Sequence, residues 1–163
     1  MALADAYDDF VMDHIKHARN YRVLDDATHQ AQGSNPLCGD ELVIYLKTER
    51  DRITDIAFQC TCCGVSMASA SIMSEQIKGK STSEARSLVG KFVAILQGSA
   101  NASAYHPTEG QNALLKTVQA LPSRASCAAL PWMTLSAALD DRSQTVLVHQ
   151  PAVQDTEAGR PES

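Results

Sequence analysis

Two β-rich stretches near the middle of the chain restrict the fold most strongly. Residues 41–49, "ELVIYLKTE", and residues 53–60, "ITDIAFQC", are rich in branched and aromatic side chains that favour extended strands. The charged residues 49–52 between them are typical of a turn, so the two stretches predict an antiparallel hairpin. Because side chains alternate along a strand, we expect Phe58 and Cys60 to share one face.

Helical periodicity characterises most of the remaining chain, because apolar residues recur at three- and four-residue steps. The predicted helices span residues 6–20, 65–78, 81–97, 113–121 and 127–141. A capping-box pattern, "STSE" at 81–84, starts the third of these helices. Pro131 lies in the last one and lacks the N–H that a helix interior requires. We therefore expect that helix to begin near Pro131 or to have a distorted first turn around Cys127.

Polar, turn-forming segments separate these elements. Residues 28–36, "THQAQGSNP", and residues 98–110 are predicted to be loops. No apolar periodicity remains after about residue 149, so we expect residues 149–163 to form a disordered tail. A chain of this length ordinarily folds as one domain, which we place at residues 1–148. The order of helix, hairpin and helices predicts an α+β fold, a small antiparallel β-sheet covered by several α-helices.

Charge and hydropathy exclude several classes of function. The formal net charge is −5 and the basic residues form no block, whereas nucleic acid binding needs a positive surface. No stretch of eighteen apolar residues exists, so no membrane helix is expected. The first ten residues, "MALADAYDDF", do not resemble a secretory signal, and we expect a cytoplasmic protein. In that reducing setting, five cysteines favour metal binding or thiol chemistry over disulfides.

The cysteines lie in three segments: Cys38 in "NPLCGDE", Cys60, Cys62 and Cys63 in "QCTCCG", and Cys127 in "RASCAAL". A turn at Gly39 could aim Cys38 and Asp40 at one point, and Cys and Asp are both zinc ligands. A zinc ion bound by three thiolates and one carboxylate would have a formal charge of about −2. Arg124 is the candidate cation to offset this charge. From the spacing alone, a shared metal site and a set of small buried cysteines both stay open.

Three motifs in the same order resemble one protein family. "NPLCGDEL", "CGVSMASASIMSEQIKGKS" and "RASCAALPW" are similar to the SufU branch of the IscU/NifU-N iron–sulfur cluster assembly family, as is the opening "YDDFVMDHIKHARN". The similarity covers about residues 7–140. Two features favour the SufU branch over the scaffold branch. Ser126 stands where scaffold members usually have histidine, and residues 98–110 look like an insertion typical of the SufU branch.

The resemblance implies a metal site and a function. It implies that Cys38, Asp40, Cys63 and Cys127 bind Zn²⁺, and that Cys38 accepts sulfur. The protein would be a sulfur carrier of the sulfurtransferase type, taking persulfide sulfur from a SufS-type cysteine desulfurase, with other iron–sulfur assembly proteins as further partners. Two alternatives stay open: a scaffold that holds a transient [2Fe–2S] cluster with the same ligands, and a non-catalytic zinc-stabilised interaction domain.

The chain departs from the family immediately before Cys63. Family members usually have a Gly-x-Gly pair there, and Cys60 and Cys62 occupy those two positions. Glycine permits backbone conformations that cysteine tolerates poorly, so the local loop is expected to differ, with Cys62 as a competitor of Cys63 for the metal. We expect Cys60 and Cys62 to be structural residues rather than further ligands or relay thiols. A reversible disulfide between Cys60 and one neighbour is the alternative.

Two further residues have a structural interpretation on the sequence alone. His14 lies on the apolar stripe of the first predicted helix and is expected to be a satisfied core histidine. Trp132, in the last predicted helix, is likewise expected in the core rather than on a contact surface.

Overall fold

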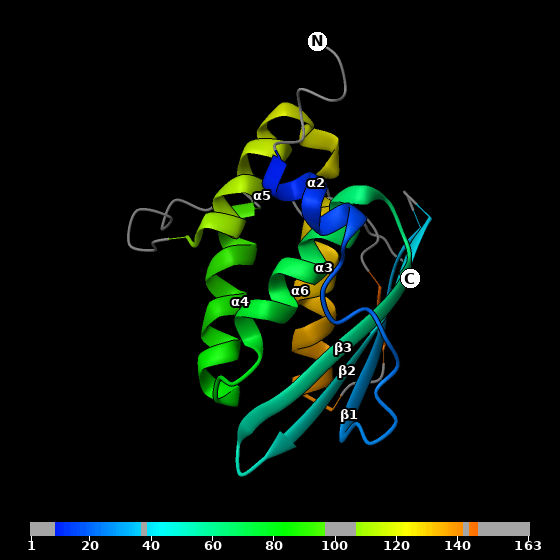
Figure 1. Ribbon diagram of the computed structural model, residues 1–163, viewed down its shortest axis with the longest axis vertical. Coiled ribbons are helices and arrows are strands. Elements are labelled where there is room, and N and C mark those ends of the chain that lie inside the picture. Colours follow the sequence, from blue (N-terminus) through cyan, green and yellow to red (C-terminus); the bar gives the residue numbers. More distant parts are fainter. Residues whose placement is uncertain (1–8, 37–38, 97–106, 142–143, 147–163) are drawn as a thin grey trace, which may run out of the picture.

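The computed structural model describes residues 9–36, 39–96, 107–141 and 144–146. Its elements in chain order are α2 (Asp9–Lys16), β1 (His29–Asn35), β2 (Asp40–Glu49), β3 (Arg52–Thr61), α3 (Gly64–Ile77), α4 (Thr82–Leu96), α5 (Glu109–Ala120), the 3₁₀ helix η2 (Pro122–Arg124), α6 (Ala125–Leu139) and β4 (Gln144–Val146). The helices cover one face of the sheet (Figure 1), which confirms the predicted α+β fold.

The sheet has the strand order β3-β2-β1-β4. Strands β2 and β3 form the predicted antiparallel hairpin, closed at the pair Glu49 and Arg52. The two residues of its turn, Arg50 and Asp51, both have positive φ, as a tight hairpin turn requires. Alternate residues of β2 are buried from its first residue onward: Asp40, Leu42, Ile44 and Leu46. The hairpin therefore presents one face to the helices, and Asp40 lies on that face.

The expectation of a loop over residues 28–36 is wrong, because β1 occupies most of this segment. Five of its seven residues are polar and the others are Ala31 and Gly33, so intrinsic strand propensity gives little signal. In the fold, β1 pairs antiparallel with β2 and parallel with β4, and these pairings supply its backbone hydrogen bonds. A Cβ atom at Gly33 would collide with Thr134 Oγ1 of α6, so glycine allows the helix to pack directly on the strand.

Helix α6 begins at Ala125 and continues through Pro131, so the expectation of a start near Pro131 is wrong. Proline cannot donate the usual helical hydrogen bond to the carbonyl four residues earlier, which here belongs to Cys127. The hydroxyl of Ser66 on α3 lies 2.9 Å from that carbonyl oxygen instead. The neighbouring helix thus supplies a donor to the carbonyl to which Pro131 cannot donate, and α6 continues.

The other helices follow the predictions with shifted ends. Helix α3 ends as expected before Gly79, whose φ is +90°. The capping box that starts α4 is confirmed, with Ser81 and Glu84 bonded to each other's backbone N–H groups at 3.1 and 3.0 Å. Helix α5 starts earlier than expected, because Thr108 and Gln111 form a second capping box. Helix α2 ends at Lys16 instead of continuing to residue 20.

Helix α3 packs against α2, α5, α6 and β3, and its small residues permit these close contacts. Trp132 is fully buried and donates from Nε1 to Ser69 Oγ at 2.9 Å, so its predicted core position is confirmed. His14 is a buried histidine as predicted, with Nδ1 2.6 Å from Ser71 Oγ, and this contact holds α2 against α3.

The remaining expectations concern a membrane helix, the loop at 98–110, the tail at 149–163, the single domain and the cellular location. No helix within the described ranges is both long and apolar enough to cross a membrane. The loop predicted at 98–110 lies largely outside the described residues, and the tail predicted at 149–163 lies entirely outside them. The single domain at residues 1–148 and the cytoplasmic location stay predictions.

Candidate metal centre

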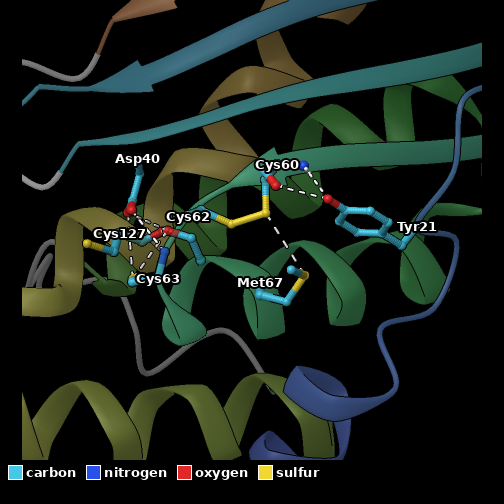
Figure 2. Close-up of a disulfide and its surroundings, with 8 residues drawn as sticks. Tyr21, Asp40, Cys60, Cys62, Cys63, Met67 and Cys127 are labelled. Atoms are coloured by element: carbon cyan, nitrogen blue, oxygen red, sulfur yellow. Dashed lines mark hydrogen bonds between the residues drawn. A yellow bond between two sulfur atoms is a disulfide. The ribbon is translucent and has the colours of Figure 1, made fainter.

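Three side chains that can bind a metal converge where three elements begin. Asp40 is the first residue of β2, Cys63 is the N-cap of α3, and Cys127 lies in the first turn of α6. Their ligand atoms, one carboxylate oxygen and two sulfurs, all lie within 4.8 Å of one another. Figure 2 shows the three labelled residues grouped together beside the disulfide.

Asp40 is buried, with 2% of its surface exposed, and hydrogen bonds hold its carboxylate in a fixed orientation. Strand alternation turns its side chain toward the helices, and a buried carboxylate requires hydrogen-bond donors. The backbone N–H of Cys63 donates to Oδ1 at 2.9 Å, and the Ser66 hydroxyl lies 2.8 Å from Oδ2. Both donors come from the N-terminal end of α3, so β2 and α3 are joined at the site.

Cys63 combines partial exposure with an environment that favours its thiolate. Its Sγ lies 3.6 Å from Asp40 Oδ2 and 3.8 Å from Ser66 Oγ. A hydrogen bond with the Cys127 thiol, followed by one from the Ser66 backbone N–H, lowers the pKa of Cys63 from 9.0 to about 6. Burial and the neighbouring Asp40 carboxylate raise this pKa, but they are outweighed. The thiolate, which is the form that binds metals, is therefore favoured at neutral pH.

Ser66 connects the three ligand-type residues and was not singled out on the sequence. Its hydroxyl oxygen lies within hydrogen-bond distance of Asp40 Oδ2 and of the Cys127 carbonyl, and it also approaches Cys63 Sγ. The signal that could have identified it is its position three residues after Cys63, in the first turn of a helix that begins at a candidate ligand. Side chains that do not bind the metal themselves but hydrogen-bond to its ligands fix the orientation of those ligands.

The structure brings Asp40, Cys63 and Cys127 together, as the predicted ligand set requires, and leaves the remaining predicted residues in different situations. Cys38 lies outside the described residues, so its ligand and acceptor roles stay predictions. Arg124 is the last residue of η2, directly before α6 and partly buried, and its charge-offsetting role also stays a prediction.

Cys60 and Cys62 form a disulfide, which is the pairing of Cys60 with a neighbour that was given as the alternative. The preference for metal binding or thiol chemistry over disulfides is wrong for this pair. The physical reason is local: the two residues lie at the end of β3 with Cα atoms 5.5 Å apart, within the range that a disulfide spans. In this state Cys62 has no thiolate with which to compete against Cys63.

The non-glycine residues with positive φ in the described chain are Asn20, Arg50, Asp51 and Asp141. The cysteines that replace the family's glycines thus adopt ordinary backbone conformations.

The donor set of the site fits zinc. Zinc binds thiolate sulfur and carboxylate oxygen, and a tetrahedron with bonds of about 2.0–2.3 Å places ligand atoms about 3.3–3.8 Å apart. The Cys63 Sγ to Asp40 Oδ2 distance of 3.6 Å matches that spacing. The described residues supply three candidate ligands, and Cys38, two positions before Asp40, is the predicted fourth.

Comparison with known proteins shows the family of the chain. The family described as the NifU-like N-terminal domain matches residues 6–128. The chain belongs to this family. It is 36% identical over 129 residues to the zinc-dependent sulfurtransferase SufU of Bacillus subtilis, which covers 79% of this chain and 86% of that protein. It is also 36% identical over 129 residues to the iron–sulfur cluster assembly scaffold protein IscU of Streptococcus pyogenes, covering 79% of each.

Solved structures support the same assignment. An iron–sulfur cluster assembly scaffold protein for the SUF system from Fervidobacterium islandicum superposes with a TM-score of 0.71 at 30% identity, over 83% of this chain and 97% of that one. A nitrogen-fixing NifU-like protein (N-terminal) from Brucella abortus gives a TM-score of 0.72 at 17% identity, over 86% of this chain and 96% of that one, and shows the fold alone. The predicted resemblance to the SufU and IscU proteins is confirmed.

Proposed function

We propose that this member of the iron–sulfur cluster assembly family is a zinc-dependent sulfur acceptor that takes persulfide sulfur from a SufS-type cysteine desulfurase. The observation that carries the proposal is the convergence of Asp40, Cys63 and Cys127, whose ligand atoms lie within 4.8 Å of one another. The proposed zinc ligands are these three residues and Cys38. Zinc, when bound, would keep the cysteine sulfurs deprotonated and protect them from oxidation.

The contacts of the site support different roles for its residues. Asp40 is held by two donors from α3, and Cys127 is fully buried in the first turn of α6, so both are suited to a fixed position. Only Gly39, whose φ is +73°, separates Cys38 from Asp40. A glycine next to Cys38 restricts the chain less than any other residue would. Cys38 is therefore the residue that we assign as the sulfur acceptor.

The transfer is a thiol–persulfide exchange. The Cys38 thiolate attacks the outer sulfur of the desulfurase persulfide, a new S–S bond forms on Cys38, and the S–S bond of the donor breaks. The desulfurase cysteine leaves as a thiolate, so the exchange involves no net oxidation or reduction. The desulfurase regains its free cysteine and can process a further molecule of cysteine.

A scaffold for a [2Fe–2S] cluster is the second candidate function, because relatives named IscU match this chain as well as SufU does. The residue before Cys127 favours the sulfur acceptor. Ser126 is buried and accepts a hydrogen bond from Asn35 Nδ2 at 3.2 Å, at the position where scaffold members usually have histidine. A serine that is already engaged with Asn35 is a poor substitute for an imidazole ligand.

The test is alanine formation by a SufS-type desulfurase under anaerobic conditions, with and without the zinc-loaded protein. We expect stimulation by the wild-type protein and the mass of one added sulfur atom on the tryptic peptide 23–47, which contains Cys38. Cys38→Ser should abolish both results. Thr61→Ala, an exposed change near the site, serves as the control that should retain them.

Three outcomes would contradict the proposal. Persulfide acceptance by Cys38→Ser would refute the assignment of the acceptor. A coloured, iron-containing protein after anaerobic purification, together with no stimulation of the desulfurase, would establish the scaffold instead. A zinc-loaded protein that neither stimulates the desulfurase nor binds iron, and that unfolds when zinc is removed, would be the non-catalytic zinc domain.

A further inference from the structure

The disulfide between Cys60 and Cys62 lies beside the metal centre and has no part in the transfer described above. Figure 2 shows it between the group of Asp40, Cys63 and Cys127 on one side and Tyr21 on the other. Cys62 directly precedes Cys63, so the pair is joined covalently to the start of α3. Both of its cysteines are partly exposed, so a small molecule can reach the pair.

The pair has one anchored and one less restrained member. Cys60 belongs to β3, and its backbone exchanges two hydrogen bonds with the Tyr21 hydroxyl, at 2.9 Å through the carbonyl and 3.3 Å through the N–H. Its Sγ also lies 4.0 Å from Met67 Sδ. Cys62 lies in the connection between β3 and α3. One sulfur is therefore held in place, while the other lies on the connecting segment beside the metal centre.

A role as a stabilising cross-link does not explain this disulfide. A cross-link stabilises a fold chiefly by restricting the unfolded chain, and its effect becomes smaller as the closed loop becomes shorter. Only Thr61 lies between Cys60 and Cys62, so the loop is among the shortest that a disulfide can close. β3 is in addition already paired with β2 along its length, up to Thr61. Partly exposed disulfides of this kind are the ones that commonly serve redox chemistry.

We propose that Cys60 and Cys62, in their reduced form, are a built-in dithiol that releases persulfide sulfur as sulfide. The inference rests on the proposed function, because it is the next reaction of the sulfur that the protein accepts. Its substrate class is a persulfide, carried by a cysteine of this protein or by a small thiol. Its product is sulfide, which is the oxidation state of the inorganic sulfur in iron–sulfur clusters.

The reaction balances in two steps. The Cys62 sulfur first attacks the outer sulfur of the persulfide, whose S–S bond breaks, so the donor returns to a thiol and Cys62 carries the persulfide. The Cys60 sulfur then attacks the Cys62 sulfur, the Cys60–Cys62 bond forms, and the outer sulfur leaves with the bonding electrons. The transferred sulfur gains two electrons, each cysteine loses one, and the two thiol protons leave with hydrogen sulfide. The disulfide seen in the structure is the product.

A second reactant completes the cycle. An external dithiol must reduce the Cys60–Cys62 disulfide by thiol–disulfide exchange before another sulfur atom can be released. Partial exposure of both cysteines is what this exchange requires. The metal centre need not change its ligands during this step, because Asp40, Cys63 and Cys127 take no part in it.

The experiment uses the full-length protein, reduced and then freed of reductant under anaerobic conditions, with glutathione persulfide as the probe. We expect one equivalent of sulfide per protein above the glutathione background. The tryptic peptide 53–78, which contains Cys60, Cys62 and Cys63, should become lighter by two hydrogens. Cys60→Ser should accumulate a persulfide on this peptide and release sulfide only after a dithiol is added. Thr61→Ala, which leaves both cysteines in place, should behave as the wild type.

The outcomes separate this inference from the proposed function. Sulfide release by Cys60→Ser equal to that of the wild type would overturn the inference, even if the desulfurase loads Cys38 normally. So would a wild-type protein that keeps its persulfide without forming the disulfide. Release with disulfide formation from glutathione persulfide, but no stimulation of the desulfurase, would uphold the dithiol and refute the sulfur-acceptor function alone.

Discussion

Replacement of Ser66 by alanine is the sharpest test of how the metal centre is organised. The Ser66 hydroxyl has one hydrogen and two acceptors in reach, Asp40 Oδ2 at 2.8 Å and the Cys127 carbonyl at 2.9 Å. The variant leaves both buried acceptors without that donor. Asp40 keeps its hydrogen bond from the Cys63 N–H. The Cys127 carbonyl receives no helical hydrogen bond from residue 131, because Pro131 has no N–H.

The size of the effect follows from these contacts. Removal of a hydrogen-bond donor from a buried acceptor costs about 1–3 kcal/mol, so the zinc-free protein should lose stability by about that amount. The orientation of Asp40 should also loosen. The loss of an outer partner of a metal ligand weakens metal binding by about 10–100-fold. We therefore expect Ser66→Ala to be both less stable and weaker in zinc binding.

Ser69→Ala is the matched control, because Ser69 lies one turn further along α3. Its hydroxyl donates to the Ala128 carbonyl at 2.6 Å and accepts from Trp132 Nε1 at 2.9 Å, so both bonds go to α6 rather than to Asp40. This variant should lose a similar amount of stability, about 1–3 kcal/mol, while its zinc affinity is unchanged.

Urea unfolding with a chelator present measures the stability of the zinc-free proteins, and competition with a zinc-binding dye measures the affinity. If Ser66→Ala binds zinc as tightly as the wild type, Ser66 does not orient the ligands. If Ser69→Ala loses as much zinc affinity as Ser66→Ala, the loss reflects general destabilisation and the reasoning is refuted.

Three further results are expected. Alkylation of Cys63 in the zinc-free protein, followed on peptide 53–78 with the Cys60–Cys62 disulfide intact, should rise around pH 6 rather than 9, and a midpoint near 9 would contradict the assigned environment. Because folding lowers this pKa from 9.0 to about 6, the free energy of unfolding of the zinc-free protein should increase as the pH rises from 6 to 9. This added stability should disappear again as the pH falls to 6. The variant Cys63→Ser should not show this pH dependence. Gly33→Ala should destabilise the protein by about 1–3 kcal/mol through its collision with Thr134, and Thr134→Ala should recover part of that loss in a thermal melt; an additive double variant would refute the contact.

Local features of the fold were predictable because their causes lie within a few residues of one another. The hairpin of β2 and β3 follows from alternating apolar side chains and a turn of two residues. The start of α4 follows from the reciprocal bonds of Ser81 and Glu84. Strand β1 was missed because its hydrogen bonds come from β2 and β4, and residues 29–35 alone contain no sign of either partner.

The sequence by itself determined the kinds of candidate metal ligand in the protein and the family to which it belongs, because both reside in short motifs with fixed residue types. Only the tertiary structure decided that Asp40, Cys63 and Cys127 lie together, since strand pairing and the packing of α3 on α6 connect segments far apart in the chain. The same packing lets α6 continue through Pro131, because Ser66 donates to the carbonyl to which proline cannot donate. The tertiary structure likewise decided that Cys60 pairs with Cys62. A disulfide requires a suitable distance between the two Cα atoms, and residue types alone do not specify this distance.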